Sequence, residues 1–249
     1  MRKQKDINNL LQVGDEGLEL KENNIAIIPA RSGSKRITKK NIKLFNGRPI
    51  ISYAISAAIE CKLFDRVIVS TDSEEIALIS KEYGAEAPFI RPKELADDYT
   101  GTVPVMKHAI ETCEELGWKI TLACCIYPCV PLIKIEDLKN VYSFLIENNG
   151  DYSYPVTEFN SPVQRALRQD NSGQMSMLDS SNQFTRSQDL EKAYYDVGQF
   201  YWGKKDAWIN ESDVLNGYGY IIPNWRVVDI DTPEDWIRAE LISKSLFSE

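Results

Sequence analysis

The sequence predicts an α/β fold in which helices cover both faces of a mostly parallel sheet, and three observations support this prediction. Short apolar runs rich in β-branched residues alternate along the chain with amphipathic segments of helical period. The runs are apolar at nearly every position, which is typical of strands buried on both faces. Turn residues separate them at the spacing of strand–helix–strand units, whose crossovers are right-handed.

The expected elements follow in chain order. Buried strands are predicted at residues 25–30 (IAIIPA), 66–70 (RVIVS) and 120–127 (ITLACCIY), and helices after Pro49 and over residues 72–83 and 102–116. Asp72 or Ser73 supplies the N-cap of the second helix, and Gly84 follows its last turn. A final strand at 226–230 (RVVDI) leads into a helix that ends near residue 248.

Two regions depart from this rhythm. Residues 1–24 are polar and aperiodic, so we expect an N-terminal extension before a single domain over 25–249. Residues 151–202 alternate polar with aromatic or apolar side chains, which predicts antiparallel strands in an insert. Inserts of this kind often make an oligomer contact.

Composition excludes several classes of protein. Hydrophobic residues make up 43% of the chain and charged residues 27%, as in ordinary globular proteins. A net charge of -8, from 29 basic and 37 acidic residues, disfavours nucleic acid and membrane surfaces as partners. No run approaches the roughly 18 apolar residues of a membrane span, and the N-terminus lacks the apolar segment of a signal peptide, so we expect a cytoplasmic protein.

The cysteines do not indicate a metal site or a disulfide framework. The five cysteines are odd in number and lie in apolar stretches, and the chain has a single histidine with which they could form a Cys/His metal site: Cys61, Cys113, Cys124, Cys125 and Cys129. We interpret them as small buried hydrophobic residues. His108 falls within an apolar helical pattern, which favours a half-buried structural histidine over a proton shuttle.

The loop after the first strand is the first candidate site, because ligands of open α/β sheets bind beyond the carboxyl ends of the strands. No acidic residue occurs between Glu22 and Glu60. Within this window Ser32, Gly33 and Ser34 allow backbone N–H groups to approach a ligand, and Arg31, Lys35, Arg36 and Lys40 supply positive charge. The loop therefore predicts an oligophosphate site, although its spacing matches neither a P-loop nor a dinucleotide fingerprint. A solvated basic loop is the alternative.

The second candidate is the segment VVDIDTPEDW. Asp229 and Asp231 are two residues apart, so in an extended chain both carboxylates point the same way. Such a pair suits Mg²⁺, or Mn²⁺ in its place, with further ligands from substrate phosphates. Alternatively, Asp231 or Thr232 is simply the N-cap of the last helix, with Pro233 as its first residue.

These motifs carry a family resemblance. The stretches PARSGSKRITKKNIKLFNGRPIISYAI, VIVSTDSEEIA, YGAEAPFIRPKELADDYTGT and VVDIDTPEDW resemble the cytidylyltransferases that activate nine-carbon, sialic-acid-like (nonulosonic) sugars as CMP derivatives. The similarity covers about residues 25–246 and is strongest to the branch that acts on pseudaminic acid. It implies a Rossmann-like nucleotidyltransferase fold, CTP and a nonulosonic acid as substrates, release of pyrophosphate, and a homodimer formed through the insert.

The resemblance also implies a role for each matching residue. The CTP site would comprise Ala30, Arg31, Ser34, Lys35, Lys40, Asn41, Arg91, Asp98 and Thr102, with catalytic charge from Arg31, Lys35, Arg36 and Lys40. The sugar site and partner contact would comprise Tyr127, Arg165, Arg186, Gln188, Gln199, Phe200 and Tyr201. Asp229 and Asp231 match the metal-binding pair of the family.

Other functions remain open at this stage. Residues 127–132 read YPCVPL where neuraminic acid enzymes have a Gln-containing QPTSPL, which favours pseudaminic over neuraminic acid, with legionaminic acid as a further alternative. A sugar-1-phosphate nucleotidyltransferase shares the same strand, basic loop and helix. A non-catalytic nucleotide or sugar sensor is the rival from another class, and retention of both aspartates speaks against it.

Overall fold

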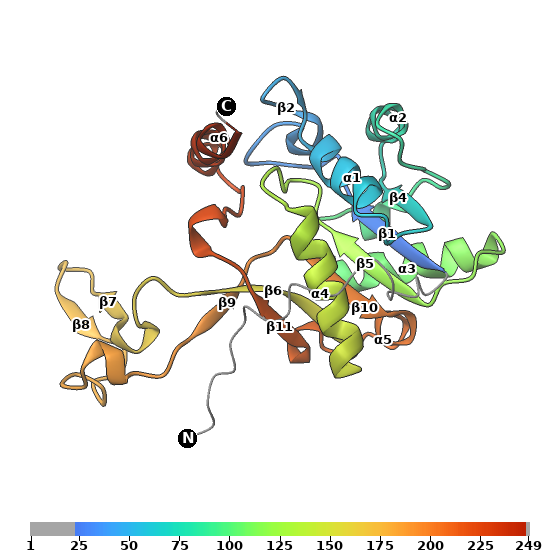
Figure 1. Cartoon of the computed structure of the whole chain (residues 1–249). Helices are drawn as coiled ribbons and strands as arrows, with labels where there is room; N and C mark the ends of the chain where they lie inside the picture. The colour runs from blue at the N-terminus through green and yellow to red at the C-terminus, as the bar shows by residue number, and fades with distance from the viewer. Residues whose placement is uncertain (1–22, 248–249) are drawn as a thin grey trace.

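A seven-stranded sheet forms the centre of the molecule (Figure 1). The computed structural model describes residues 23–247, so the expected extension lies outside the described residues except for Asn23 and Asn24. The strands of the sheet are β1 (Asn24–Pro29), β4 (Arg66–Ser70), β5 (Leu122–Ile126), β6 (Tyr152–Glu158), β9 (Tyr194–Asp196), β10 (Phe200–Lys204) and β11 (Tyr218–Ile221). The first three confirm the predicted strands, and β1 begins one residue earlier than expected.

The sheet is mostly parallel, as predicted. Its order is β11-β6-β10-β5-β1-β4, with β9 paired to β6 off this path. β1 lies between β4 and β5 and is parallel to both, with Ile27 opposite Ile68 and Cys125. β10 runs antiparallel to both of its neighbours, β5 and β6. The carboxyl ends of β1, β4 and β5 therefore meet at one edge of the sheet.

Helices cover both faces of this sheet. The helices are α1 (Ile51–Glu60), α2 (Glu74–Glu82), α3 (Thr102–Glu115), α4 (Ile135–Asn148), α5 (Lys205–Ile209) and α6 (Pro233–Phe247). Alternate strand residues divide the core: Ala26 and Ile28 pack with α1, α2 and α4, whereas Ile25 and Ile27 pack with α3 and α5. None of the helices within residues 23–247 has the length and apolar character to cross a membrane.

The predicted helix ends are confirmed at α2 and α3. The Ser73 hydroxyl caps α2 by accepting a hydrogen bond from the backbone N–H of Ile76. Gly84 and Gly117 follow α2 and α3 with φ of +93° and +87°, where a side chain would be strained. α4 is a long helix that the sequence analysis did not place, although its buried residues follow a helical period.

The predicted insert is only partly separate from the sheet. Its first and last strands, β6 and β10, belong to the centre of the sheet. Residues 159–193, which we name the arm, leave the molecule on one side and carry the hairpin of β7 (Leu167–Gln169) and β8 (Met175–Met177) (Figure 1). The Phe159 N–H bonds the Ala193 carbonyl at 3.1 Å and closes the base of the arm.

The prediction of a strand at residues 226–230 is wrong, because these residues pair with no strand of the described structure. The Arg226 guanidinium, almost fully buried, instead binds both carboxylate oxygens of Asp137 on α4 at 2.5 and 2.8 Å. Downstream, Val228 and Ile230 are buried beside α6. α6 itself packs on the short hairpin of β2 (Leu44–Phe45) and β3 (Arg48–Pro49), where Trp236 meets Phe45 edge to face.

Candidate active site

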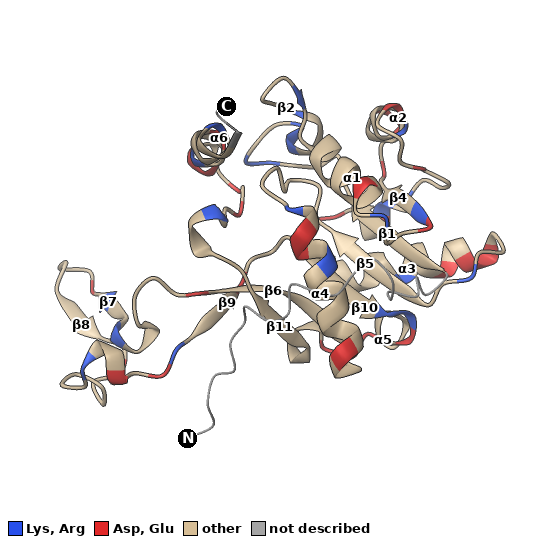
Figure 2. Ribbon diagram, viewed as in Figure 1, with Lys and Arg blue, Asp and Glu red and all other residues tan. Residues whose placement is uncertain are grey.

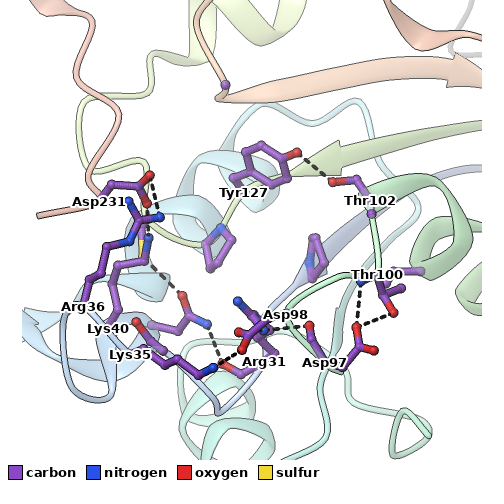
Figure 3. A pocket seen from close by; sticks show the side chains of 18 of the residues that line it. Arg31, Lys35, Arg36, Lys40, Asp97, Asp98, Thr100, Thr102, Tyr127 and Asp231 are labelled. Atoms are coloured by element: carbon purple, nitrogen blue, oxygen red, sulfur yellow. Dashed lines mark hydrogen bonds and ion pairs between the residues drawn. The ribbon is translucent and has the colours of Figure 1, made fainter. Parts of the chain in front are cut away.

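A cavity of about 570 Å³ opens beyond the carboxyl ends of β1 and β5. Four segments supply most of its lining: the basic loop (residues 31–41), residues 91–102, residues 127–129 and residues 229–231. The basic loop and residues 127–129 directly follow the parallel strands β1 and β5. Residues 91–102 begin after Ile90, which bridges to Thr71 just beyond β4, so these three segments meet at the same edge of the sheet although they are distant in sequence. Both regions that the sequence analysis singled out thus face a single cavity (Figure 3).

Most of the predicted site residues line this cavity. They are Arg31, Ser34, Lys35, Arg36, Lys40, Asn41, Arg91, Asp98, Thr102, Tyr127, Asp229 and Asp231. Ala30 does not, because it is fully buried at the end of β1. The remaining predicted sugar-site residues lie elsewhere and are described below.

The basic loop is fixed at both of its ends. At the start, Asp72 accepts hydrogen bonds from the backbone N–H of Ser32 at 2.8 Å and from its hydroxyl at 2.6 Å. These bonds lower the pKa of Asp72 although its burial raises it. A Cβ added to Gly33 would meet no atom within 4 Å, so space is open beside this backbone. At the other end, Asn41 Nδ2 donates to the Arg31 carbonyl at 2.8 Å.

Two carboxylates hold four of the five cations of the loop, and the fifth, Lys39, pairs with Glu75. Asp98 binds Arg31 at 2.7 Å and also contacts Lys35, whereas Asp231 binds Arg36 at 2.9 Å and Lys40 at 3.3 Å (Figure 3). Figure 2 shows where acidic and basic residues lie along the ribbon of the whole molecule. Hydrogen bonds from the two cations lower the pKa of Asp98. All these pairs are at least partly exposed to solvent, so each contributes little to stability. A phosphate group entering the cavity can therefore compete for the same cations.

Arg91 is a buried cation without a full set of partners. Its residue is only 4% exposed, and Nε and Nη2 of its guanidinium have no hydrogen-bond partner. Burial lowers the pKa of Arg91, and the negative charge of Asp72 acts against this shift. The Asp72 carboxylate itself accepts hydrogen bonds from Ser32. Because an unpaired buried charge is costly, this arrangement is typical of a binding site that a ligand completes.

The two aspartates of the last segment are free of the helix cap. Thr232 caps α6 in a reciprocal arrangement with Asp235, whose carboxylate accepts from the backbone N–H of both Asp231 and Thr232. Of the two alternatives, Thr232 rather than Asp231 is thus the cap. Partial desolvation at the cavity wall and the neighbouring Asp231 charge raise the pKa of Asp229, although the residue remains exposed to solvent. Asp229 thus lies in a position where a nearby cation would stabilise its charged form.

This aspartate pair fits a divalent cation only together with a ligand. No group of three or more His, Cys, Asp or Glu residues that could hold a metal occurs in the described part of the chain. Asp229 and Asp231 supply hard oxygen atoms to the cavity, and Asp231 also neutralises Arg36 and Lys40. The residues therefore fit a metal that takes its remaining ligands from phosphate and water, as Mg²⁺ does.

Tyr127 forms the wall opposite the basic loop. Its hydroxyl lies 2.7 Å from Thr102 Oγ1 at the start of α3, and its ring meets Tyr201 edge to face. Burial raises the pKa of Tyr127 to about 12, so the hydroxyl stays protonated at neutral pH. The Tyr201 hydroxyl donates to Asp196, whose other oxygen accepts from the backbone N–H of Gly198 at the cavity.

Six of the seven predicted sugar-site residues do not line the cavity, and one of them, Tyr201, is buried behind the cavity residue Tyr127. Gln199 is 2% exposed, and its carbonyl accepts a hydrogen bond from the Tyr127 N–H. Phe200 is fully buried with the α1 and α4 side chains, so it packs in the core. The other three lie on the arm: Arg165, Arg186 and Gln188.

The structure adds four residues to the site that the sequence analysis did not assign. Asp72 anchors the basic loop, Asp97 caps the turn at Thr100, Cys129 contacts Asn41, and Asp196 holds the turn beside Gly198. Asp72 and Cys129 could have been found, because both follow predicted strands at their carboxyl ends. The other two lie in irregular turns, where no sequence period marks them.

The cysteines behave largely as predicted. All five are free, and four of them are buried in the core: Cys61, Cys113, Cys124 and Cys125. Cys129 differs because it lines the cavity. Burial raises the pKa of its thiol to about 12. His108 is half-buried in α3, and its ring meets Phe89 edge to face.

Comparison with known proteins agrees with this geometry. A cytidylyltransferase family model matches residues 25–215. The chain is 41% identical over 223 residues to the pseudaminic acid cytidylyltransferase of Campylobacter jejuni, covering 89% of this chain and 96% of that protein. It is 30% identical over 215 residues to the N-acylneuraminate cytidylyltransferase of Escherichia coli, covering 85% of this chain and 50% of that protein.

A solved structure shows the same fold at low sequence identity. The CMP:2-keto-3-deoxy-manno-octonic acid synthetase complexed with CTP superposes with a TM-score of 0.67 at 14% identity, over 90% of this chain and all of that one. The family model matches most of the chain, and the Campylobacter protein is similar to it over nearly its full length. This chain belongs to the cytidylyltransferase family.

Proposed function

We propose that the protein transfers CMP from CTP to the anomeric hydroxyl of a nonulosonic acid, and that this sugar is pseudaminic acid. The observation that carries the proposal is the single cavity in which four cations and a buried, unsatisfied arginine face two aspartates. The 41% identity to a pseudaminic acid cytidylyltransferase over 96% of that protein supports the choice of sugar. The aromatic wall at Tyr127 is consistent with a sugar that carries apolar substituents.

Nucleotidyl transfer requires the protein to align the reactants and to neutralise phosphate charge. In the proposed reaction the anomeric oxygen attacks the α-phosphorus, and the bond to pyrophosphate breaks. Lys35, Arg36 and Lys40 take up the charge of the departing pyrophosphate, which replaces their present contacts with Asp98 and Asp231. Arg31 is held to the same cavity by Asn41 and orients the triphosphate.

A divalent cation completes the proposed site. Asp229 and Asp231 would hold it, and when bound it supplies positive charge beside the α-phosphate. The chain's own contribution is to keep both carboxylates at the cavity: Ile230 is buried between them, and Lys40 Nζ donates to the Ile230 carbonyl at 2.8 Å. Asp235 fixes the backbone N–H of Asp231 from the other side.

Substrate identity can be tested directly with purified protein. We expect CTP and pseudaminic acid with Mg²⁺ to yield CMP-pseudaminic acid and pyrophosphate, detected by mass spectrometry and a coupled phosphate assay. UTP, GTP and ATP should give less than about 1% of that rate, a discrimination typical of sites that hydrogen-bond the substrate. Faster turnover of legionaminic or neuraminic acid would overturn the sugar assignment, and binding without pyrophosphate release would indicate a sensor.

The metal assignment predicts a selective loss in Asp229→Ala. We expect turnover to fall by about 10²- to 10³-fold, while the thermal midpoint of unfolding stays within about 3 °C of wild type, because this carboxylate is destabilised where it lies. Asp206→Ala, at an exposed aspartate of α5, is the matched control and should retain full activity. A near-normal kcat for Asp229→Ala at saturating Mg²⁺ would contradict the assignment.

Arg91→Met should uncouple stability from binding. Replacing a buried, incompletely paired cation by an apolar side chain should raise the thermal midpoint of the nucleotide-free protein by about 2 to 8 °C, and should abolish the further stabilisation by CTP. Arg66→Met is the control, because Arg66 is exposed, pairs with Glu86 and lies over Trp118. It should lose some stability and keep its response to CTP. If Arg91→Met retained that response, Arg91 would have no place in the site.

We further propose that the arm joins two copies of the chain. It exposes large apolar side chains close together in sequence: Val163, Leu167, Met175, Leu178 and Phe184. Pairing would cover them and bring the arm's Arg165, Arg186 and Gln188 to the partner's cavity. Sedimentation should therefore show a dimer for wild type and a monomer for Leu178→Asp/Phe184→Asp. Leu241→Asp on α6, equally exposed, should remain a dimer; a wild-type monomer at micromolar concentration would refute the pairing.

A further inference from the structure

Cys129 is the one residue of the cavity's 127–129 segment whose side chain contacts the basic loop by hydrogen bonding. Its sulfur lies 3.2 Å from Oδ1 of Asn41. Asn41 is only 6% exposed, and its Nδ2 donates to the Arg31 carbonyl at 2.8 Å. A chain of two hydrogen bonds therefore runs from the loop after β5, through one buried amide, to the first residue of the loop after β1.

The direction of both bonds follows from the chemistry of the groups. A backbone carbonyl only accepts, so the Arg31 carbonyl fixes the amide nitrogen of Asn41 on its own side. The amide oxygen then faces Cys129, and the thiol must be the donor. Burial keeps the pKa of this thiol far above neutral, so the donor proton is present under ordinary assay conditions. Both ends of the Asn41 amide are thus satisfied.

This chain of hydrogen bonds matters because it ties the main chain of the basic loop to the segment after β5, whereas most of the loop's other ties are ion pairs of its side chains. Residues 31–39 contain no helix or strand, and Lys39, next to the end of the loop, has a left-handed backbone with φ of +51°. The Ser32 N–H is bonded to Asp72. Among the side-chain hydrogen bonds described for the main chain of Arg31, only the bond from Asn41 connects it towards β5. The orientation of this amide is therefore one of the contacts that set where the cations of the loop meet the cavity.

We infer that Cys129 is a positioning residue for the nucleotide: its thiol orients the Asn41 amide, which holds the Arg31 backbone and thereby aligns the basic loop with the triphosphate. The inference rests on the proposed function, because it assumes CTP as the ligand. Cys129 itself contacts no reacting atom in this account. Its effect should appear in the binding of CTP more than in the chemical step.

The test compares variants that keep or remove the donor. Cys129→Ala and Cys129→Val lack it, and we expect the Kd for CTP and the KM for CTP to rise by about three- to tenfold, the loss of one hydrogen bond, while kcat changes by less than about twofold. Cys129→Ser keeps a donor and should stay within about twofold of wild type. Val fills the space that Ala vacates, so instability of Cys129→Ala would not prevent the measurement. Isothermal titration with CTP and Mg²⁺ gives Kd without turnover.

Two controls separate positioning from general damage. Cys113→Ala makes the same change in the buried core of α3 and should lower the thermal midpoint while leaving the Kd for CTP unchanged. In an Asn41→Ala background, Cys129→Ala should raise Kd by less than about twofold further, because both act through one amide. The inference would be overturned if Cys129→Val bound CTP as tightly as wild type, or if Cys129→Ser bound CTP as weakly as Cys129→Val. It would also be overturned if the effects of Cys129→Ala and Asn41→Ala on the Kd for CTP were additive. Absence of CTP binding by wild type would overturn the proposed function instead.

Discussion

Compensation of positive charge at one edge of the sheet is the constraint on which the site depends. The basic loop contains no acidic residue, so its cations would repel one another unless carboxylates came from elsewhere. The fold supplies Asp98 from the segment before α3 and Asp231 from the segment before α6. These exposed ion pairs hold the cations near one another at little energetic cost. Because the pairs are weak, the cations remain available to a more highly charged phosphate group.

The rest of the structure holds these distant segments in place. Parallel pairing of β1 with β4 and β5 brings three loops to the same edge. The last segment has no strand partner, and it is fixed by individual contacts at successive points: Arg226 on Asp137, Ile230 in the core, and Asp235 at the helix cap. A buried ion pair of this kind contributes more to defining a position than to net stability. Here the position it defines is that of the aspartate pair.

Sequence reasoning succeeded where local pattern decides the outcome. Residues 25–30 are apolar throughout and residues 66–70 have the apolar, β-branched centre VIV, so their strands were predictable to within a residue. Asp229 and Asp231 face one cavity although residues 226–230 are not a strand, because alternation needs only an extended backbone. The antiparallel place of β10 depends on long-range pairing that no local pattern encodes. Yet Phe200 and Tyr201 could have been separated, because successive residues of a strand point to opposite faces and cannot both line one site.

The cavity wall contains a buried cation whose hydrogen-bonding groups are not all satisfied, Arg91. Buried polar atoms without partners occur at the cavity, as Nε and Nη2 of Arg91, and also in the core, as the hydroxyl groups of Ser52 and Tyr152. Arg91 differs from these two residues because it carries a full charge. Such groups cost free energy in the unliganded protein. The cost is compatible with folding because the two helical layers bury large apolar side chains on each face, such as Trp202 and Trp208. A site whose polar groups lack partners until the ligand arrives gains more free energy from binding than a site whose polar groups are already satisfied. For that reason the unpaired guanidinium of Arg91 indicates a ligand site more strongly than the exposed cations around it do.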